Sequence, residues 1–350
     1  MLSRVANTFY WMVRHVERAD NLARLIDVNQ QLLLDSEELD RQQLNAIWEP
    51  IIQSAGDDEA FHALHADANS AEAVDFLALD RRNPNSVCSC VAHARENARM
   101  VRDQLSDELW EELNSLYLFV NSANASRMLS QEPVLFHQTI RRSAVTFLGI
   151  AASTLARNEA WEFMSLGRHL ERADKTTRFL DINSYLPVDD ESPRGASFDA
   201  LHWSAILRSC GALGAYRVTK REIDARGVFD FLVFAREFPR SVSFCIERVD
   251  QALHCISGSP QGSFVNEAER RTGKLLAELN FGSTEEAFDI GLHSTLDGLQ
   301  QQFNAIGDAI FESFVLMPEK FQVSIPSDPS SPSASALSHQ WQMQQMQQQQ

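Results

Sequence analysis

Residues 9–28 read FYWMVRHVERADNLARLIDV, and residues 163–182 read FMSLGRHLERADKTTRFLDI. Both stretches contain the string Arg-His-x-Glu-Arg-Ala-Asp, and both place apolar residues at spacings of three and four. This spacing is typical of a helix that buries one face. Because similarity within one chain indicates a repeated structural unit, we predict a fold built from two copies of one helical unit.

Two further blocks recur at nearly the same separation. WEPIIQSAG at residues 48–56 matches WSAILRSCG at residues 203–211, and DFLALDRRNPNSVCSC at residues 75–90 matches DFLVFAREFPRSVSFC at residues 230–245. Duplication of one whole segment explains the three blocks together.

The chain is predicted to be all α, because helical spacing continues almost throughout and the sustained alternation typical of strands does not occur. We expect a first unit over residues 1–157 and a second over residues 158–317, packed on the first around an approximate twofold axis. Residues 318–350 are rich in Ser and Pro and then in Gln, which predicts a disordered tail. The expected helices include long ones over residues 106–129, 198–218 and 284–316.

The composition disfavours several classes of partner. The 350 residues carry a formal net charge of −17, whereas nucleic acids and anionic membranes attract a concentrated basic surface. The five cysteines are an odd number, as is typical of free thiols in a reducing compartment. No apolar stretch approaches the roughly 20 residues that span a bilayer, and no targeting segment is visible. We therefore predict a cytoplasmic protein that binds neither nucleic acid nor membrane.

The repeated helix also repeats its charges. Opposite the apolar arc lie Arg14, Glu17, Asp20, Asn21, Arg24 and Asp27 in the first copy and Arg168, Glu171, Asp174, Lys175, Arg178 and Asp181 in the second. A solvated face varies freely among polar residue types, so this repetition needs a cause. Either these side chains contact one another, or they contact a ligand.

The first interpretation is structural. The two helices would pack together near the twofold axis, with Glu17 and Glu171 paired to Arg172, Arg18 or neighbouring arginines. Such ion-pair networks occur in helical bundles and also imitate functional sites.

The second interpretation is an arginine-lined cleft that binds a carboxylate, a phosphate or an acyl-phosphate, because the guanidinium group matches these anions with two parallel hydrogen bonds. Glu17 and Glu171 would hold the guanidinium groups or act as general bases, and they are the catalytic candidates. Helices expected to start at Pro84 and Pro239 would add backbone N–H groups for an anion, with plain capping as the alternative. The candidate ligand-binding residues are Arg14, Glu17, Arg18, Asp20, Arg168, Glu171, Arg172, Asp174, Arg82, Asn85, Arg95 and Arg240.

We predict no metal and no cofactor. His15 and Glu17 stand two residues apart, so on a helix they point about 200° away from each other and cannot chelate one ion. The pair Cys88 and Cys90 lacks a second ligand pair with zinc-site spacing. Walker, dinucleotide-binding and nucleophile-elbow motifs are absent.

These residues resemble the alpha-E family. The resemblance rests on MLSRVANTFYWMVRHVERADNLARLIDV, RRNPNSVCSCVAHARENARMVRDQLSDELWEELNSLYL, FMSLGRHLERADKTTRFLD, LRSCGALGAYR and FPRSV, and it covers about residues 1–316. The Glu-Arg pairs of the family are present as Glu17-Arg18 and Glu171-Arg172. The resemblance implies an all-helical bacterial protein associated with a circularly permuted ATP-grasp ligase, often alongside a transglutaminase-like protease and a proteasome-like peptidase.

The resemblance implies a role in forming amide bonds during peptide synthesis or modification. We expect an accessory or substrate-presenting partner of the ligase that holds a carboxylate or a peptide end in the cleft. One alternative is an enzyme acting on an acyl-phosphate or a peptide, with Glu17 or Glu171 as general base. The other is a purely structural interaction module.

Overall fold

The computed structural model describes residues 3–35, 47–65, 69–185, 196–219 and 222–316. Every secondary-structure element within these ranges is a helix, which confirms the predicted all-α class. Contacts group residues Met1–Leu316 into one compact unit. The division at residue 157 and the approximate twofold axis stay predictions, and the predicted tail lies outside the described residues.

The described helices are spread over both halves of the chain. The first half contains α1 (Ser3–Asp35), α3 (Trp48–Ala55), α4 (Asp58–His62), α5 (Ser70–Ala78), α6 (Val87–Met100), η1 (Arg102–Gln104), α7 (Asp107–Val120), α8 (Ala123–Gln131) and α9 (Pro133–Thr154). The second contains α10 (Glu159–Asp181), η2 (Ile182–Tyr185), α11 (Ala196–Ser209), α12 (Leu213–Thr219), α13 (Ala225–Phe234), α14 (Val242–Ser257), α15 (Glu267–Phe281), α16 (Thr284–Ile290) and α17 (Leu292–Phe314).

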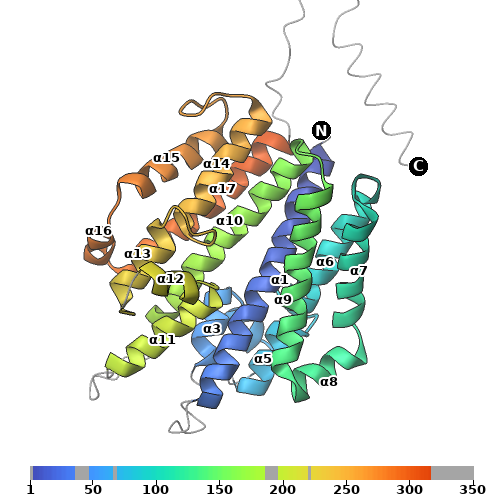
Figure 1. The fold of residues 1–350 in the computed structure, drawn as a ribbon, viewed down its shortest axis with the longest axis vertical. Helices are drawn as coiled ribbons and strands as arrows, with labels where there is room; N and C mark the ends of the chain where they lie inside the picture. The colour runs from blue at the N-terminus through green and yellow to red at the C-terminus, as the bar shows by residue number, and fades with distance from the viewer. Residues whose placement is uncertain (1–2, 36–46, 66–68, 186–195, 220–221, 317–350) are drawn as a thin grey trace, which may run out of the picture. The chain divides into compact units, whose positions relative to one another are not determined.

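The two repeated helices, α1 and α10, lie side by side through the middle of the bundle (Figure 1). Helices α6 and α9 pack on α1, and helices α14 and α17 pack on α10. The contact between α1 and α10 is close at Gly167, where a Cβ atom would stand 2.2 Å from the carbonyl oxygen of Tyr10. The charged arcs of both helices therefore meet inside the bundle.

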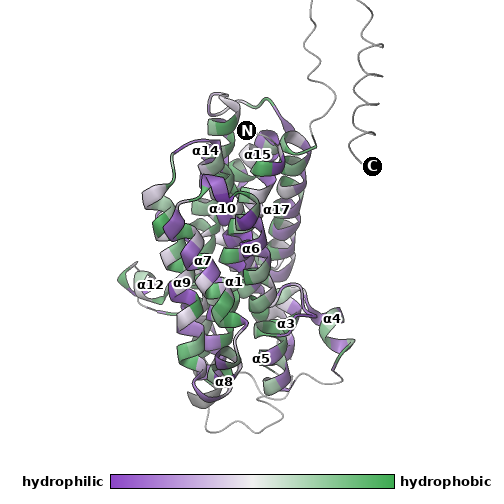
Figure 2. Ribbon diagram, turned by 90° about the vertical axis from the view of Figure 1, so that its right-hand side faces the viewer, coloured by the Kyte–Doolittle hydropathy of each residue, from purple (hydrophilic) through white to green (hydrophobic). Residues whose placement is uncertain are grey.

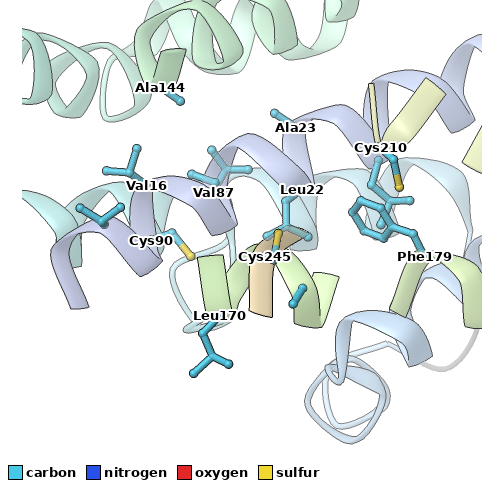
Figure 3. Packing of buried hydrophobic residues seen from close by; sticks show 14 of the residues in the cluster. Val16, Leu22, Ala23, Val87, Cys90, Ala144, Leu170, Phe179, Cys210 and Cys245 are labelled. Atoms are coloured by element: carbon cyan, nitrogen blue, oxygen red, sulfur yellow. The ribbon is translucent and has the colours of Figure 1, made fainter. Parts of the chain in front are cut away.

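The core surrounds these two helices. Hydrophilic and hydrophobic segments alternate along the helices, as expected of amphipathic elements (Figure 2). Val16 and Leu22 of α1, Leu170 of α10 and the thiols of Cys90 and Cys245 are packed in the buried cluster (Figure 3). Neighbours thus enclose α1 on its apolar face and on much of its charged face.

Three predicted helices are each two helices in the structure: those over residues 106–129, 198–218 and 284–316. The first is interrupted at Ser122, whose side chain accepts a hydrogen bond from the Ala125 backbone N–H and caps α8. The other two are interrupted at Gly211 and Gly291, which have positive φ values of 62° and 107°. Side-chain caps and left-handed glycines end helices that periodicity alone would continue.

Candidate functional site

Crosswise ion pairs join the two Glu-Arg sequences at the centre of the bundle. Glu17 accepts hydrogen bonds from Nε and Nη2 of Arg172 at 2.7 and 2.8 Å. Glu171 accepts hydrogen bonds from Nε and Nη2 of Arg18 at 2.6 and 3.1 Å. The glutamate of each copy is therefore bound by the arginine of the other, as the first interpretation predicts.

Further guanidinium groups surround both carboxylates. Arg14 donates from Nε to Glu171 at 2.8 Å, and its Nη1 donates to the Tyr10 hydroxyl at 2.9 Å. On the other side, Nη1 of Arg240 lies 3.2 Å from Glu17, and Nε of Arg168 lies 3.9 Å from it. Each carboxylate is thus held by more than one arginine.

The surrounding arginines keep both glutamates ionised although the glutamates are buried. The side chains of Glu17 and Glu171 have no exposed surface. Although burial alone raises its pKa, the charges of Arg172 and Arg240 lower the pKa of Glu17 to about 2. Burial likewise opposes ionisation of Glu171, but Arg18 and Arg14 hold its pKa well below its usual range. A general base works best with a pKa near the operating pH, so this environment disfavours that role for either glutamate.

The loops before α6 and α14 contact the cluster through different residues. Asn85 accepts a hydrogen bond from Nη1 of Arg18 at 2.6 Å. Arg240, at the matching position of the second loop, donates from Nη1 to Asn21 at 2.7 Å and from Nη2 to Asp20 at 2.6 Å. Asn85 and Arg240 therefore lie in one cluster with the repeated helices.

The two aspartates of the repeated motif belong to the same cluster. Asp20 accepts from Nε of Arg24 at 2.9 Å, and Asp174 accepts from Nε of Arg178 at 2.9 Å. Asp174 also lies 3.7 Å from the ammonium group of Lys175, which is buried. Burial lowers the pKa of Lys175 below its ordinary value. These contacts extend the ionic cluster one turn further along each helix.

The helices predicted to start at Pro84 and Pro239 start three residues later, at Val87 and Val242. The residues before them cap the helices: the Ser86 hydroxyl oxygen accepts from the Ser89 N–H, and the Ser241 hydroxyl oxygen accepts from the Phe244 N–H, each at 3.2 Å. The prolines lie in the preceding turns because a serine supplies the first-turn acceptor. The geometry therefore fits capping better than an anion site.

Two predicted ligand-binding residues are not in the cluster. The guanidinium group of Arg82 pairs with Asp80 at 2.6 Å, and the Arg82 side chain is 62% exposed. Arg95 faces α7, where its Nε donates to Asn114 at 3.0 Å and its guanidinium group stacks on the Tyr117 ring. Arg95 therefore faces α7 and does not join the ion-pair cluster of α1 and α10.

Both histidines of the repeated motif are held neutral. Burial and the nearby charge of Arg18 lower the pKa of His15 from 6.5 to about 3. Burial and the charge of Arg172 lower the pKa of His169 from 6.5 to about 3, and its Nδ1 lies 2.8 Å from the Ser165 carbonyl oxygen. The two imidazoles are therefore uncharged near neutral pH.

A pocket of about 440 Å³ lies against one side of the cluster, between α1, α10 and α17. Arg14 and Arg18 line it, and their side chains are 15% and 17% exposed. Arg168 and Arg172 do not line it. The predicted arginine-lined cleft is therefore an open pocket at Arg14 and Arg18, whereas Arg172 lies in a closed ion-pair cluster. The other lining residues are Asn7, Tyr10, Trp11, Phe163, Phe303, Asn304, Gly307, Asp308, Ile310, Phe311 and Val315.

Sequence reasoning missed the wall that α17 supplies. Gly307 is the one local signal there, because a glycine inside a helix often marks a close approach. A Cβ atom at Gly307 would lie 3.7 Å from the Tyr10 hydroxyl and 4.0 Å from Nη1 of Arg14. No pattern in the repeated motif pointed to this helix.

The fold and the site define an all-helical bundle in which two crosswise Glu-Arg pairs join the two central helices. The chain belongs to the Alpha-E family, described as a predicted alpha-helical domain with a conserved ER motif, which matches residues 1–315. The two Glu-Arg pairs of this chain are the residues that the crosswise hydrogen bonds join.

The chain is also similar to longer mycobacterial proteins described as uncharacterized. One from Mycobacterium bovis and one from Mycobacterium tuberculosis strain CDC 1551 are 23% identical to it over 343 residues, covering 91% of this chain. A protein of M. tuberculosis strain H37Rv is 22% identical over the same length. The chain spans 38% of the length of these relatives. No solved structure matches the chain.

Among the helices that the structure describes, none combines the length and the apolar character that a membrane crossing requires.

Proposed function

We propose that this Alpha-E protein is an accessory, substrate-presenting partner of an ATP-grasp-type amide ligase. It holds a ligand bearing a carboxylate or a phosphate group against Arg14 and Arg18. The ligase, a circularly permuted ATP-grasp enzyme by family resemblance, supplies the ATP chemistry. Transglutaminase-like and proteasome-like peptidases are further partners by the same resemblance.

The observation that carries the proposal is that Arg14 and Arg18 share one carboxylate, Glu171, at the wall of a pocket. Each guanidinium group has five N–H donors. Nη2 of Arg14 lies 2.8 Å from Glu171, so this contact and those described above use one donor on each nitrogen. A second donor on each terminal nitrogen is therefore left for a ligand. A guanidinium group fixed by a carboxylate loses little conformational entropy when an anion binds.

The lengths of the relatives also favour an accessory role. The chain spans 38% of each mycobacterial relative, so most of each relative lies outside the match. An Alpha-E unit joined to a larger remainder is the arrangement expected of a module that works beside another activity.

The two alternatives, an enzyme and a purely structural module, make predictions that differ from those of the accessory role. An enzyme with a glutamate general base has less support, because the pKa of Glu17 is about 2 and the pKa of Glu171 is also lowered. A structural module would need the ion-pair core but not the pocket. Variants that change the pocket and spare the core therefore separate the structural module from the accessory role.

The test measures ADP release and amide product from ATP with short peptides and free amino acids as substrates. The protein is assayed alone, the ligase alone, and the two together. We expect product to rise at least tenfold in the mixture over either protein alone. Turnover by this chain alone would favour the enzyme, and an unchanged rate in the mixture would contradict the accessory role.

Arg14→Gln is the informative variant, because Glu171 keeps its bonds to Arg18 and the core stays paired. We expect this variant to lose most of the ligase-dependent product. Arg99→Gln is the matched control, since Arg99 is exposed on α6 and pairs with Glu96 alone among the described residues. If folded Arg14→Gln supports product as well as the control does, a structural module is the better description.

A further inference from the structure

We propose that the pocket between α1, α10 and α17 binds an α-carboxylate next to a bulky apolar side chain, as found at the C-terminus of a peptide. This inference deepens the proposed function, because it names the ligand class of the same site. Three features of the pocket carry it: its two ends differ in chemistry, its volume suits one or two residues, and its second wall bears a carboxylate.

The first feature is the polar end, where the pocket meets the ionic cluster. Arg14 and Arg18 stand one turn apart on α1, and Asn304 of α17 lines the same space. Glu171 and the Tyr10 hydroxyl hold the guanidinium group of Arg14 in place through hydrogen bonds. A small planar anion such as a carboxylate can then take the remaining guanidinium hydrogens without reorganising the core.

The apolar end follows from the direction of α17. Near its start, His293 bonds to Asp181 at the end of α10, at 2.8 Å. At its end, the Phe314 ring packs edge-on against Phe163 near the start of α10, with ring centroids 5.7 Å apart. The two helices therefore run antiparallel, as the ribbon shows (Figure 1).

This direction sorts the lining side chains along the pocket. Phe303 and Asn304 lie toward Arg18, and Gly307 lies beside Tyr10 and Arg14. Further along the chain from Gly307, the apolar residues Ile310, Phe311 and Val315 line the pocket, and together with Phe163 of α10 they form an apolar chamber. A ligand that places its carboxylate on the arginines therefore directs its side chain into this chamber.

The volume of the pocket and the carboxylate of Asp308 narrow the class of ligand further. A volume of about 440 Å³ lies in the lower part of the ~300–1,000 Å³ typical of ligand pockets, which leaves room for one or two residues. Asp308 of α17 also lines the pocket, and its side chain is exposed. It can receive the ammonium group of a free amino acid or an amide N–H of a longer peptide. Inorganic phosphate has no group for the apolar chamber or for Asp308.

The test is calorimetric titration of the full chain with five probes. They are an N-acetylated tripeptide ending in Phe with a free carboxylate, the same tripeptide as its C-terminal amide, the same sequence ending in Ala, free phenylalanine and inorganic phosphate. We expect the Phe-ending acid to bind, and the amide and the Ala-ending acid to bind at least tenfold more weakly. Free phenylalanine binding as tightly as the peptide would identify an amino acid as the source of the same chemistry.

Matched variants keep the result independent of folding. Arg14→Gln should weaken binding of the Phe-ending acid at least tenfold, and Arg99→Gln should leave this affinity unchanged. Gly307→Leu should abolish binding by filling the pocket, whereas Gly307→Ala should retain it, because its Cβ meets its neighbours at ordinary contact distance. Circular dichroism melting confirms that each variant is folded.

Three outcomes would overturn the inference: equal binding of acid and amide, equally tight binding of phosphate, or no binding of any probe at millimolar concentration. The ligase assay reads a different quantity. Loss of probe binding with retained stimulation of the ligase would remove this ligand class and leave the accessory role. Probe binding without stimulation of the ligase would leave this ligand class and remove the accessory role.

Discussion

Glu17 and Glu171 owe their environment to helical geometry. Successive residues on a helix point about 100° apart, so a glutamate cannot pair face to face with the arginine that follows it. In the two helices packed side by side, each glutamate pairs with the arginine of the other helix: Arg172 donates to Glu17, and Arg18 donates to Glu171. Removing one partner from a buried ion pair typically costs about 3–5 kcal/mol, because the other charge stays buried. The Glu-Arg sequence is thus explained as a device that joins two helices.

The crosswise pairing predicts which residues are energetically coupled. In a double-mutant cycle, Glu17→Gln and Arg172→Gln should show a coupling energy of about 1–3 kcal/mol, because these side chains share two hydrogen bonds. Glu17→Gln and Arg18→Gln should couple by less than about 0.5 kcal/mol, although these residues are neighbours in sequence. Urea unfolding of the single and double variants measures both values. Stronger coupling of Glu17 to Arg18 would contradict the crosswise pairing.

At the scale of elements, glycine sets how closely helices approach. Gly167 brings α10 against the backbone of α1, where a Cβ atom would stand 2.2 Å from the Tyr10 carbonyl oxygen. Other helical glycines have open space, as at Gly273 of α15, where a Cβ atom would meet no neighbouring atom within 4 Å. The close approach shortens the distance between the charged faces of α1 and α10. Arginines of one helix can therefore bind glutamates of the other.

Alanine substitutions at these two glycines should act in opposite directions. Gly167→Ala should destabilise by about 1–3 kcal/mol or more, because the methyl group forces α1 and α10 apart. Gly273→Ala should stabilise by about 0.5–1 kcal/mol, the usual gain in helix propensity. Thermal and urea unfolding measure both effects. Two stabilised variants would show that α1 and α10 do not touch at Gly167.

At the scale of the molecule, the sequence was sufficient for the all-α class and for the central helix pair. Repetition of Glu17 and Arg18 as Glu171 and Arg172 gave their pairing as one of two interpretations, and the crosswise hydrogen bonds agree with that interpretation. Interruptions such as Ser122 were missed, since apolar spacing continues across a cap.

The pocket wall could not be predicted, because α17 reaches Arg14 only through tertiary packing and carries no repeated charge. The extent to which the charged arc is buried could not be predicted either. The spacing of polar residues shows which face of a helix is polar but not how many helices pack against that face. For the same reason the sequence did not show that Arg95, a candidate ligand-binding residue, faces α7.

Enclosing ionisable groups in one core makes the whole molecule sensitive to acid. The pKa values of His15 and His169 fall from 6.5 to about 3, and that of Glu17 falls from 4.5 to about 2. Each group has a lower pKa folded than unfolded, so the unfolded chain binds more protons as the pH falls and stability is lost. The contribution of the two histidines to the free energy of unfolding is complete above about pH 6.5 and declines below it. The contribution of Glu17 declines below about pH 4.5.

His169→Gln tests this dependence, because glutamine can donate to the Ser165 carbonyl oxygen but does not titrate. A histidine held neutral contributes at most about 1.36 kcal/mol per pH unit below its unfolded pKa, or roughly 2 kcal/mol between pH 7 and pH 5. Urea unfolding at pH 7, 6 and 5 should therefore give a shallower loss of stability for His169→Gln than for the parent protein. An identical slope would mean that His169 is protonated inside the fold, beside Arg168 and Arg172, and that the core tolerates a third positive charge there.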